Sequence, residues 1–168
     1  MGLLKCIRNQ PHITMMCTFL GATQLDLQFA QGLHFPSKVS MAKKTYSCDL
    51  GRLRKGMPGL TPAAGGYLAE AAAVCLEHQS HIPGISLSVD GSYGRTVRLS
   101  WERVGNQERL TYADLHEATE YGACGIAILV VENAARKVVV KRSKKGTFFD
   151  YWVGLEGKGE LFQGDRVT

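Results

Sequence analysis

The hydrophobic positions of the chain become periodic from about residue 61 onward. Between 61 and 82, apolar side chains recur every three or four positions, which is typical of a helix with one buried face. Thr61 can cap this helix, Pro62 suits its first turn, and Pro83 stops its continuation. The pattern therefore predicts a helix that ends before Pro83-Gly84.

Strict alternation of apolar and polar residues follows this helix. It runs through 85–89 and resumes at 97–101, on either side of a turn that opens with Asp90-Gly91. Both turn residues tolerate the backbone angles of a tight hairpin. We expect an antiparallel ribbon that packs its apolar face on a core.

A second helix is indicated from about Thr111 to residue 135. Thr111 and Asp114 have the spacing of a capping box, with an acid in the second position. Residues 125–131 are nearly all apolar, so this half of the helix should be buried on several sides. Two short strands follow, at 137–143 and 148–154, and the connector between them suits an antiparallel turn.

These elements predict one α+β domain at 41–168. We expect an antiparallel or mixed sheet built from the two hairpins, with the two helices packed on one face. Residues 1–40 lack a sustained period, and our hypothesis is a poorly ordered extension upstream of a true start at Met41. Residues 41–60 are basic and rich in glycine, and are interpreted as a loop whose cations are solvated or contact phosphate.

Composition narrows the class of protein. The chain has 168 residues, 45% hydrophobic and 21% charged, as in a soluble globular domain. No apolar run approaches the ~18 residues of a membrane span. The 5 cysteines are scattered without a CxxC pair, which favours reduced thiols in a cytoplasmic protein. A net charge of +5 is compatible with nucleic acid but does not require it.

Two acids stand out as candidates for metal chemistry. Glu120 lies where the second helix turns apolar, with His116 and Glu117 on neighbouring lines of the same helix. Asp150 lies among aromatic residues, where an isolated charge is costly to bury. It must face solvent, pair with Lys141 or Arg142, or bind a metal. Oxygen ligands of this kind suit Mg²⁺, and solvated or ion-paired acids are the alternative.

The second hairpin is strongly basic. Lys141, Arg142, Lys144 and Lys145 lie close to Asp150 in sequence. A solvated hairpin explains such a run. The sharper hypothesis is that these cations hold phosphate groups beside a metal-binding acid, because nucleases need that arrangement.

The stretches "ATEYGA" at 118–123 and "RSKKGTFFDYWVG" at 142–154 carry a resemblance. From about Met41 onward the chain resembles a family of uncharacterised bacterial proteins whose members have ATE-x-GA and RS-x-KGTGFDYWLG motifs. The resemblance implies no established activity.

The order of elements is similar to the first half of PD-(D/E)xK nucleases, as an analogy of fold. Those enzymes place an acid-x-Lys pair on the next strand. Glu156-Gly157-Lys158 is such a triplet, but it follows Asp150 too closely, in a glycine-rich turn. Members of the family continue into a strand with "LEVSG", from which this chain departs after 161–163. A truncated, degenerate nuclease is therefore one hypothesis.

Two functions remain open. In the first, Glu120 and Asp150 are catalytic and hold Mg²⁺ while the four hairpin cations bind the nucleic-acid phosphates. In the second, the protein is a non-catalytic module that binds nucleic acid or a protein partner, with Trp101 or Trp152 as exposed anchors.

Overall fold

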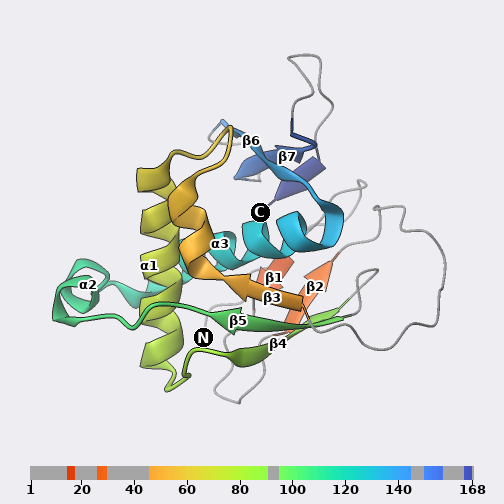
Figure 1. The fold of residues 1–168 in the computed structure, drawn as a ribbon. Helices are drawn as coiled ribbons and strands as arrows, with labels where there is room; N and C mark the ends of the chain where they lie inside the picture. Colours follow the sequence, from red (N-terminus) through yellow and green to blue (C-terminus); the bar gives the residue numbers. More distant parts are fainter. Residues whose placement is uncertain are drawn as a thin grey trace.

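The computed structural model describes residues 15–17, 26–29, 46–90, 95–144, 150–156 and 165–167, arranged as in Figure 1. Two longer helices, one short helix, a 3₁₀ helix and short strands make up this part of the chain. The helical elements are η1 (Leu50–Lys55), α1 (Pro62–His78), α2 (Asn106–Thr111) and α3 (Leu115–Ala135). The strands are β1 (Met15–Cys17), β2 (Asp26–Phe29), β3 (Tyr46–Asp49), β4 (Ile85–Asp90), β5 (Arg95–Ser100), β6 (Val138–Arg142), β7 (Tyr151–Gly154) and β8 (Asp165–Val167).

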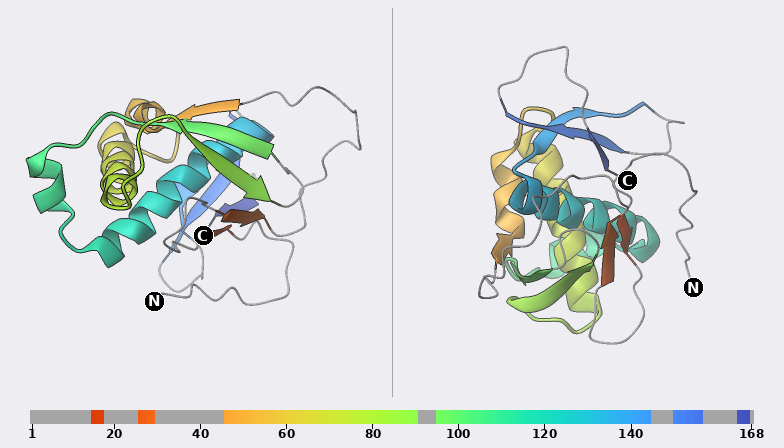
Figure 2. Two further views of the ribbon diagram at one scale, coloured as in Figure 1. Left: turned by 90° about the horizontal axis from the view of Figure 1, so that it is seen from below. Right: turned by 90° about the vertical axis from the view of Figure 1, so that its right-hand side faces the viewer.

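The predicted α+β class is confirmed, but the two hairpins do not share a sheet. The β4–β5 hairpin belongs to a mixed 5-stranded sheet of order β1-β2-β4-β5-β3. The β6–β7 hairpin belongs to an antiparallel 3-stranded sheet of order β6-β7-β8. Helix α3 runs between the two sheets in Figure 1 and in the right-hand view of Figure 2.

The composition of α3 explains why it separates the sheets. Residues 124–131 are all buried, as expected from their apolar run. A helix that is apolar on all sides needs cover on more than one side. A sheet on each side, with α1 packed across it, satisfies that need.

Glycines allow α1 and α3 to pack closely. A Cβ built on Gly122 would lie 2.8 Å from the Cα of Ala72, and one on Gly125 would lie 3.1 Å from the Cβ of Leu68. Atoms at the first of these distances overlap, so only glycine permits this approach. The small residues in the apolar stripe of α3 thus mark its contact with α1.

The helix starts follow the sequence signals with one correction. Thr61 caps α1, its Oγ1 accepting from the Ala64 N–H at 3.3 Å, and Pro62 is the first helical residue. Helix α3 begins after Asp114, whose Oδ1 accepts from the N–H groups of His116 at 3.0 Å and Glu117 at 3.3 Å. Thr111 instead ends the short helix α2, so the Thr111–Asp114 capping box was a wrong prediction.

The interpretation of 41–60 as a loop was wrong for residues 46–55. Strand β3 pairs in parallel with β5, and η1 follows it directly. The main core includes three side chains of this segment, Cys48, Leu50 and Leu53. Their burial stabilises the segment although most of its other residues are polar. Residues 41–45 lie outside the described part of the chain.

The hypothesis of a poorly ordered extension at 1–40 falls largely outside the described residues. Within that range the structure describes β1 and β2, of which β2 pairs in parallel with β4. None of the described helices combines the length and the hydrophobicity needed to cross a lipid bilayer.

Candidate functional site

The two predicted acids approach the same stretch of α3. Glu120 is on this helix with 59% of its side chain exposed, and its Oε1 lies 3.8 Å from Nδ1 of His116. Asp150 directly precedes β7, is exposed, and has its Oδ2 4.0 Å from Sγ of Cys124. Cys124 is one helical turn beyond Glu120, a rise of about 6 Å. Asp150 therefore lies next to the turn of α3 that follows Glu120, on the same side of the helix.

Within the described residues, no three His, Cys, Asp or Glu side chains are grouped so that they could hold a metal ion. The two carboxylates offer the oxygen ligands that Mg²⁺ prefers. The thiol of Cys124, next to Asp150, is buried and is a softer ligand. Glu120 and Asp150 alone would leave most positions around Mg²⁺ to water or to substrate phosphate oxygens.

A β-bulge positions the predicted cations. The pairing of β6 with β7 shifts between Val139 and Lys141, so Val140 is the extra residue. Beyond the bulge Lys141 is opposite Trp152 and Arg142 is opposite Tyr151. Lys141, Arg142 and Lys144 are exposed, and Lys145 lies outside the described residues.

Arg142 lies over an aromatic ring. Its guanidinium carbon is 5.8 Å from the centroid of Tyr151, within the range of a cation–π contact. Burial raises the pKa of Tyr151 to about 12, with Cys124 adding to the shift and Arg142 opposing it. The phenol is therefore neutral at physiological pH, and the guanidinium of Arg142 packs on the face of its ring.

A shallow groove of about 740 Å³ lies beside Lys141 and Arg142. Its other wall is formed by Lys55, the last residue of η1, and by the segment that joins η1 to α1, and Glu156 also contributes to the lining. The groove therefore gathers three cations and one acid from segments far apart in the sequence. Sequence reasoning placed Lys55 in a basic segment but could not bring it to the second hairpin.

Gly59 holds the two walls of this groove together. Its N–H donates to the carbonyl of Val139 at 2.8 Å. A Cβ on Gly59 would lie 2.3 Å from the carbonyl carbon of Val140, so any other residue would push the loop away from β6. The Pro58-Gly59 pair was the only local signal for this contact, and by itself it predicts no more than a turn.

Among the described side chains, the two arginines of η1 each form an ion pair, unlike the lysine that follows them. Arg52 bonds Glu132 at 2.7 Å, and Arg54 bonds Glu70 at 3.0 Å. By contrast, neither Lys55 nor Lys141 forms an ion pair with any residue that the structure describes. The positive charge of the groove is thus not cancelled within that part of the chain.

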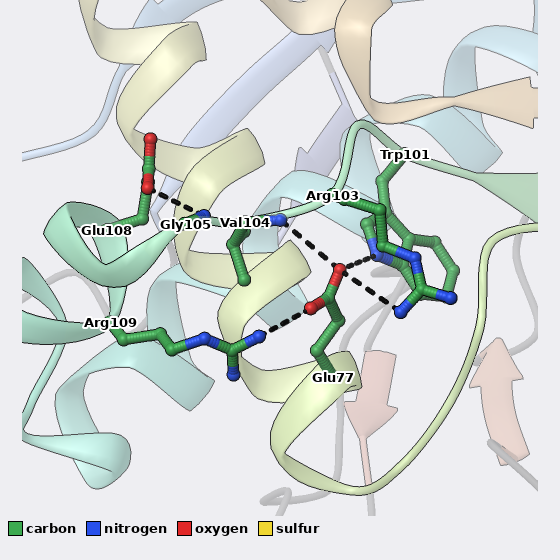
Figure 3. A network of polar contacts seen from close by, with 7 residues as sticks. All are labelled: Glu77, Trp101, Arg103, Val104, Gly105, Glu108 and Arg109. Carbon is green, nitrogen blue, oxygen red and sulfur yellow. Dashed lines mark hydrogen bonds and ion pairs between the residues drawn. The ribbon is translucent and has the colours of Figure 1, made fainter.

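A network of polar contacts around Glu77 has a structural role (Figure 3). The Glu77 side chain, at the end of α1, is only 5% exposed. It accepts hydrogen bonds from Nε1 of Trp101 at 3.3 Å, from the N–H of Val104 at 3.3 Å and from Nη2 of Arg109 at 2.7 Å. Trp101 and Val104 belong to the connection from β5 to α2 and Arg109 belongs to α2, so this carboxylate fixes both segments to α1.

This cluster also decides between the predicted aromatic anchors. Trp101 is 5% exposed and belongs to the core, so the hypothesis of Trp101 as an exposed anchor was wrong. Trp152 is half-buried on β7 and its role as an anchor stays a prediction.

Comparisons of the chain with protein-family models, with curated proteins and with solved structures gave no match.

Proposed function

We propose that the protein binds nucleic acid through the basic groove, defined here by Lys55, Lys141 and Arg142, and through the adjoining Lys144 and Lys145. The observation that carries the proposal is the convergence of cations from η1 and β6 on one open groove, with Lys55 and Lys141 outside every described ion pair. Lys and Arg side chains in such a row neutralise successive phosphates.

The distribution of charge favours a polyanion over a small anion. The groove is open to solvent, so its cations do not enclose a small ligand on all sides. Arg142 is stiffened by its contact with Tyr151, which lowers the entropy lost when it binds a phosphate. Glu156 is the one acid in the lining, and it leaves the groove with a net positive charge.

Replacing Lys55 and Lys141 together by glutamine is expected to weaken DNA binding uniformly across sequences. The loss of two phosphate contacts should reduce the slope of log K against log salt by about 1.5. Fluorescence anisotropy with a labelled oligonucleotide, measured over a salt series, checks this result.

The matched control exploits an exposed cation on the other sheet. Arg98 of β5 is exposed and lies away from the groove lining, so Arg98→Gln should leave the salt slope unchanged, whereas Arg142→Gln should reduce it by about 0.8. Equal affinities for wild type and for the Lys55–Lys141 double variant would contradict the proposal and favour a protein partner.

A second candidate function is phosphodiester hydrolysis with Mg²⁺. The observation that favours it is the position of Asp150 beside Cys124, one turn of α3 from Glu120, close to the cations of β6. Glu120 and Asp150 would hold the ion, which would supply charge for the attacked phosphate. The basic groove would bind the nucleic-acid substrate, so this activity depends on the binding proposed above.

Glu120→Gln and Asp150→Asn are each expected to lower Mg²⁺-dependent cleavage of a labelled oligonucleotide by about a hundredfold or more, because amides are poorer ligands of hard cations. Binding without metal should persist in both variants. Glu102→Gln is the control, since Glu102 is exposed and lies on the connection from β5 to α2. Undetectable cleavage by the wild type with Mg²⁺ would end this candidate and leave binding alone.

A further inference from the structure

Three tyrosines form a cluster where α1 meets α3. The ring centroid of Tyr67 lies 5.1 Å from that of Tyr112 and 5.0 Å from that of Tyr121, with the second pair edge to face. Tyr112 is buried at 4% exposure, while Tyr67 remains 41% exposed. Tyr67 is among the few large apolar residues that the described surface leaves open.

Tyr112 and Tyr121 restrict the position of the Tyr67 ring. The Tyr112 hydroxyl donates to the carbonyl of Tyr67 at 2.9 Å and lies 3.3 Å from Oε2 of Glu70. Tyr112 and Tyr121 pack against the Tyr67 ring, so its rotamer is restricted before any ligand arrives. A rigid, exposed aromatic ring loses little entropy when another flat ring stacks on it.

Tyr67 lies in the second turn of α1, the helix whose start lines the basic groove. Thr61 and Pro62, which open α1, line the groove, and Tyr67 follows Pro62 by a rise of roughly 7.5 Å along the helix. Helical side chains lean toward the N-terminus of their helix, here toward the groove.

Arg142 connects the groove to the tyrosines. It lines the groove and lies over Tyr151, and its charge opposes the rise that burial causes in the pKa of Tyr121. Tyr121 in turn contacts Tyr67. Three cations, Lys55, Lys141 and Arg142, thus share the groove lining, and the tyrosine cluster with the open ring of Tyr67 lies on α1, the helix whose first residue, Pro62, lines the same groove.

We infer that the nucleic acid bound by this protein is single-stranded, with its phosphates along the basic groove and one base stacked on Tyr67. The inference rests on the function proposed above. Bases of a duplex are already stacked on each other and do not reach a protein ring, whereas bases of a single strand are free to do so. A basic track beside an aromatic ring is the combination that single strands require.

The test compares a labelled 12-residue oligothymidylate, the matching oligouridylate and a blunt duplex of the same length, ~12 base pairs, by fluorescence anisotropy at one salt concentration. We expect tighter binding of the single strands than of the duplex. Tyr67→Leu should weaken single-strand binding about tenfold or more and leave duplex binding unchanged, while Tyr67→Phe should retain single-strand affinity, because the ring and not the hydroxyl stacks.

A measurement on the unchanged protein avoids any folding defect of Tyr67→Leu. Ultraviolet crosslinking to oligothymidylate, followed by peptide mass spectrometry, should place the crosslink on the peptide that contains Tyr67. Equal affinity for single strand and duplex, with no crosslink at Tyr67, would overturn the inference while a salt slope that depends on Lys55 and Lys141 still supported the proposed function. Binding to neither nucleic acid would overturn both.

Discussion

Gly65→Ala is expected to destabilise the protein by about 3 kcal/mol, at the upper end of the usual cost of overpacking a core. A Cβ at Gly65 would lie 2.0 Å from the carbonyl oxygen of Leu53 and 2.7 Å from its carbonyl carbon. Both are backbone atoms of η1, which has the buried side chains of Leu50 and Leu53 and cannot turn aside as a flexible side chain would. Helix α1 and η1 must therefore separate.

The adjacent glycine provides the control. A Cβ at Gly66 would meet only the Arg54 side chain, at 3.6 Å and 4.0 Å, which is ordinary contact. Gly66→Ala should therefore stabilise the protein by about 0.5–1 kcal/mol, because alanine favours the helix.

Chemical denaturation of the wild type and both variants measures the two changes in free energy, and thermal unfolding measures the corresponding changes in melting temperature. The Gly65→Ala change should lower the melting temperature by roughly 6–12 °C, and Gly66→Ala should raise it slightly. Similar changes for both glycines would mean that η1 does not pack on α1 as closely as the structure has it.

Glu77→Ala is the second large effect, with an expected loss of about 2–4 kcal/mol in the free energy of unfolding. The substitution removes a buried carboxylate and leaves the N–H groups of Trp101 and Val104 without their acceptor. Part of the usual cost of breaking a buried ion pair is absent, because Arg109 is 47% exposed and regains water.

Two further variants separate charge from hydrogen bonding at this position. Glu77→Gln keeps an oxygen for Trp101 but loses the charge that faces Arg109, so its loss should be intermediate. Glu102→Ala, on an exposed neighbour, should change stability by less than about 0.5 kcal/mol. Equal denaturation midpoints for Glu77→Ala and Glu102→Ala would contradict the structural role of the cluster.

The elements with strong local signals could be predicted from the sequence. Thr61, Pro62 and Pro83 bound the first helix, and the structure has α1 between them. The alternation in the first hairpin predicted its buried face, and Leu87, Val89, Val97 and Leu99 are all in the core. In these cases capping and periodicity act over a few residues, so the signal is contained in the segment itself.

Strand β3 and η1 could not be predicted in this way. The segment is short, basic and rich in glycine, and its strand exists because β5 offers a free edge for parallel pairing. A parallel partner lies far away in sequence, so no local period reports it. The division of the hairpins between two sheets has the same origin, because it depends on where α3 packs.

Some residues of the candidate site could be named from the sequence, and others could be found only from the tertiary structure. Glu120, Asp150, Lys141 and Arg142 were named from residue type and spacing, and their functional roles stay predictions. Lys55 and Tyr67 were not named as members of the site. Lys55 reaches it because Gly59 holds its loop against β6, and Tyr67 reaches it through the contact of α1 with α3.

The sequence by itself determined the two longer helices, the first hairpin and the apolar faces, since these depend on interactions between near neighbours in the chain. The tertiary structure alone decided which sheet each hairpin joins and which cations share a groove. It also determined that a tyrosine of α1, the helix whose start lines this groove, keeps an exposed ring. Those outcomes depend on backbone approaches at Gly59, Gly65 and Gly122, where the absence of a side chain lets distant segments meet.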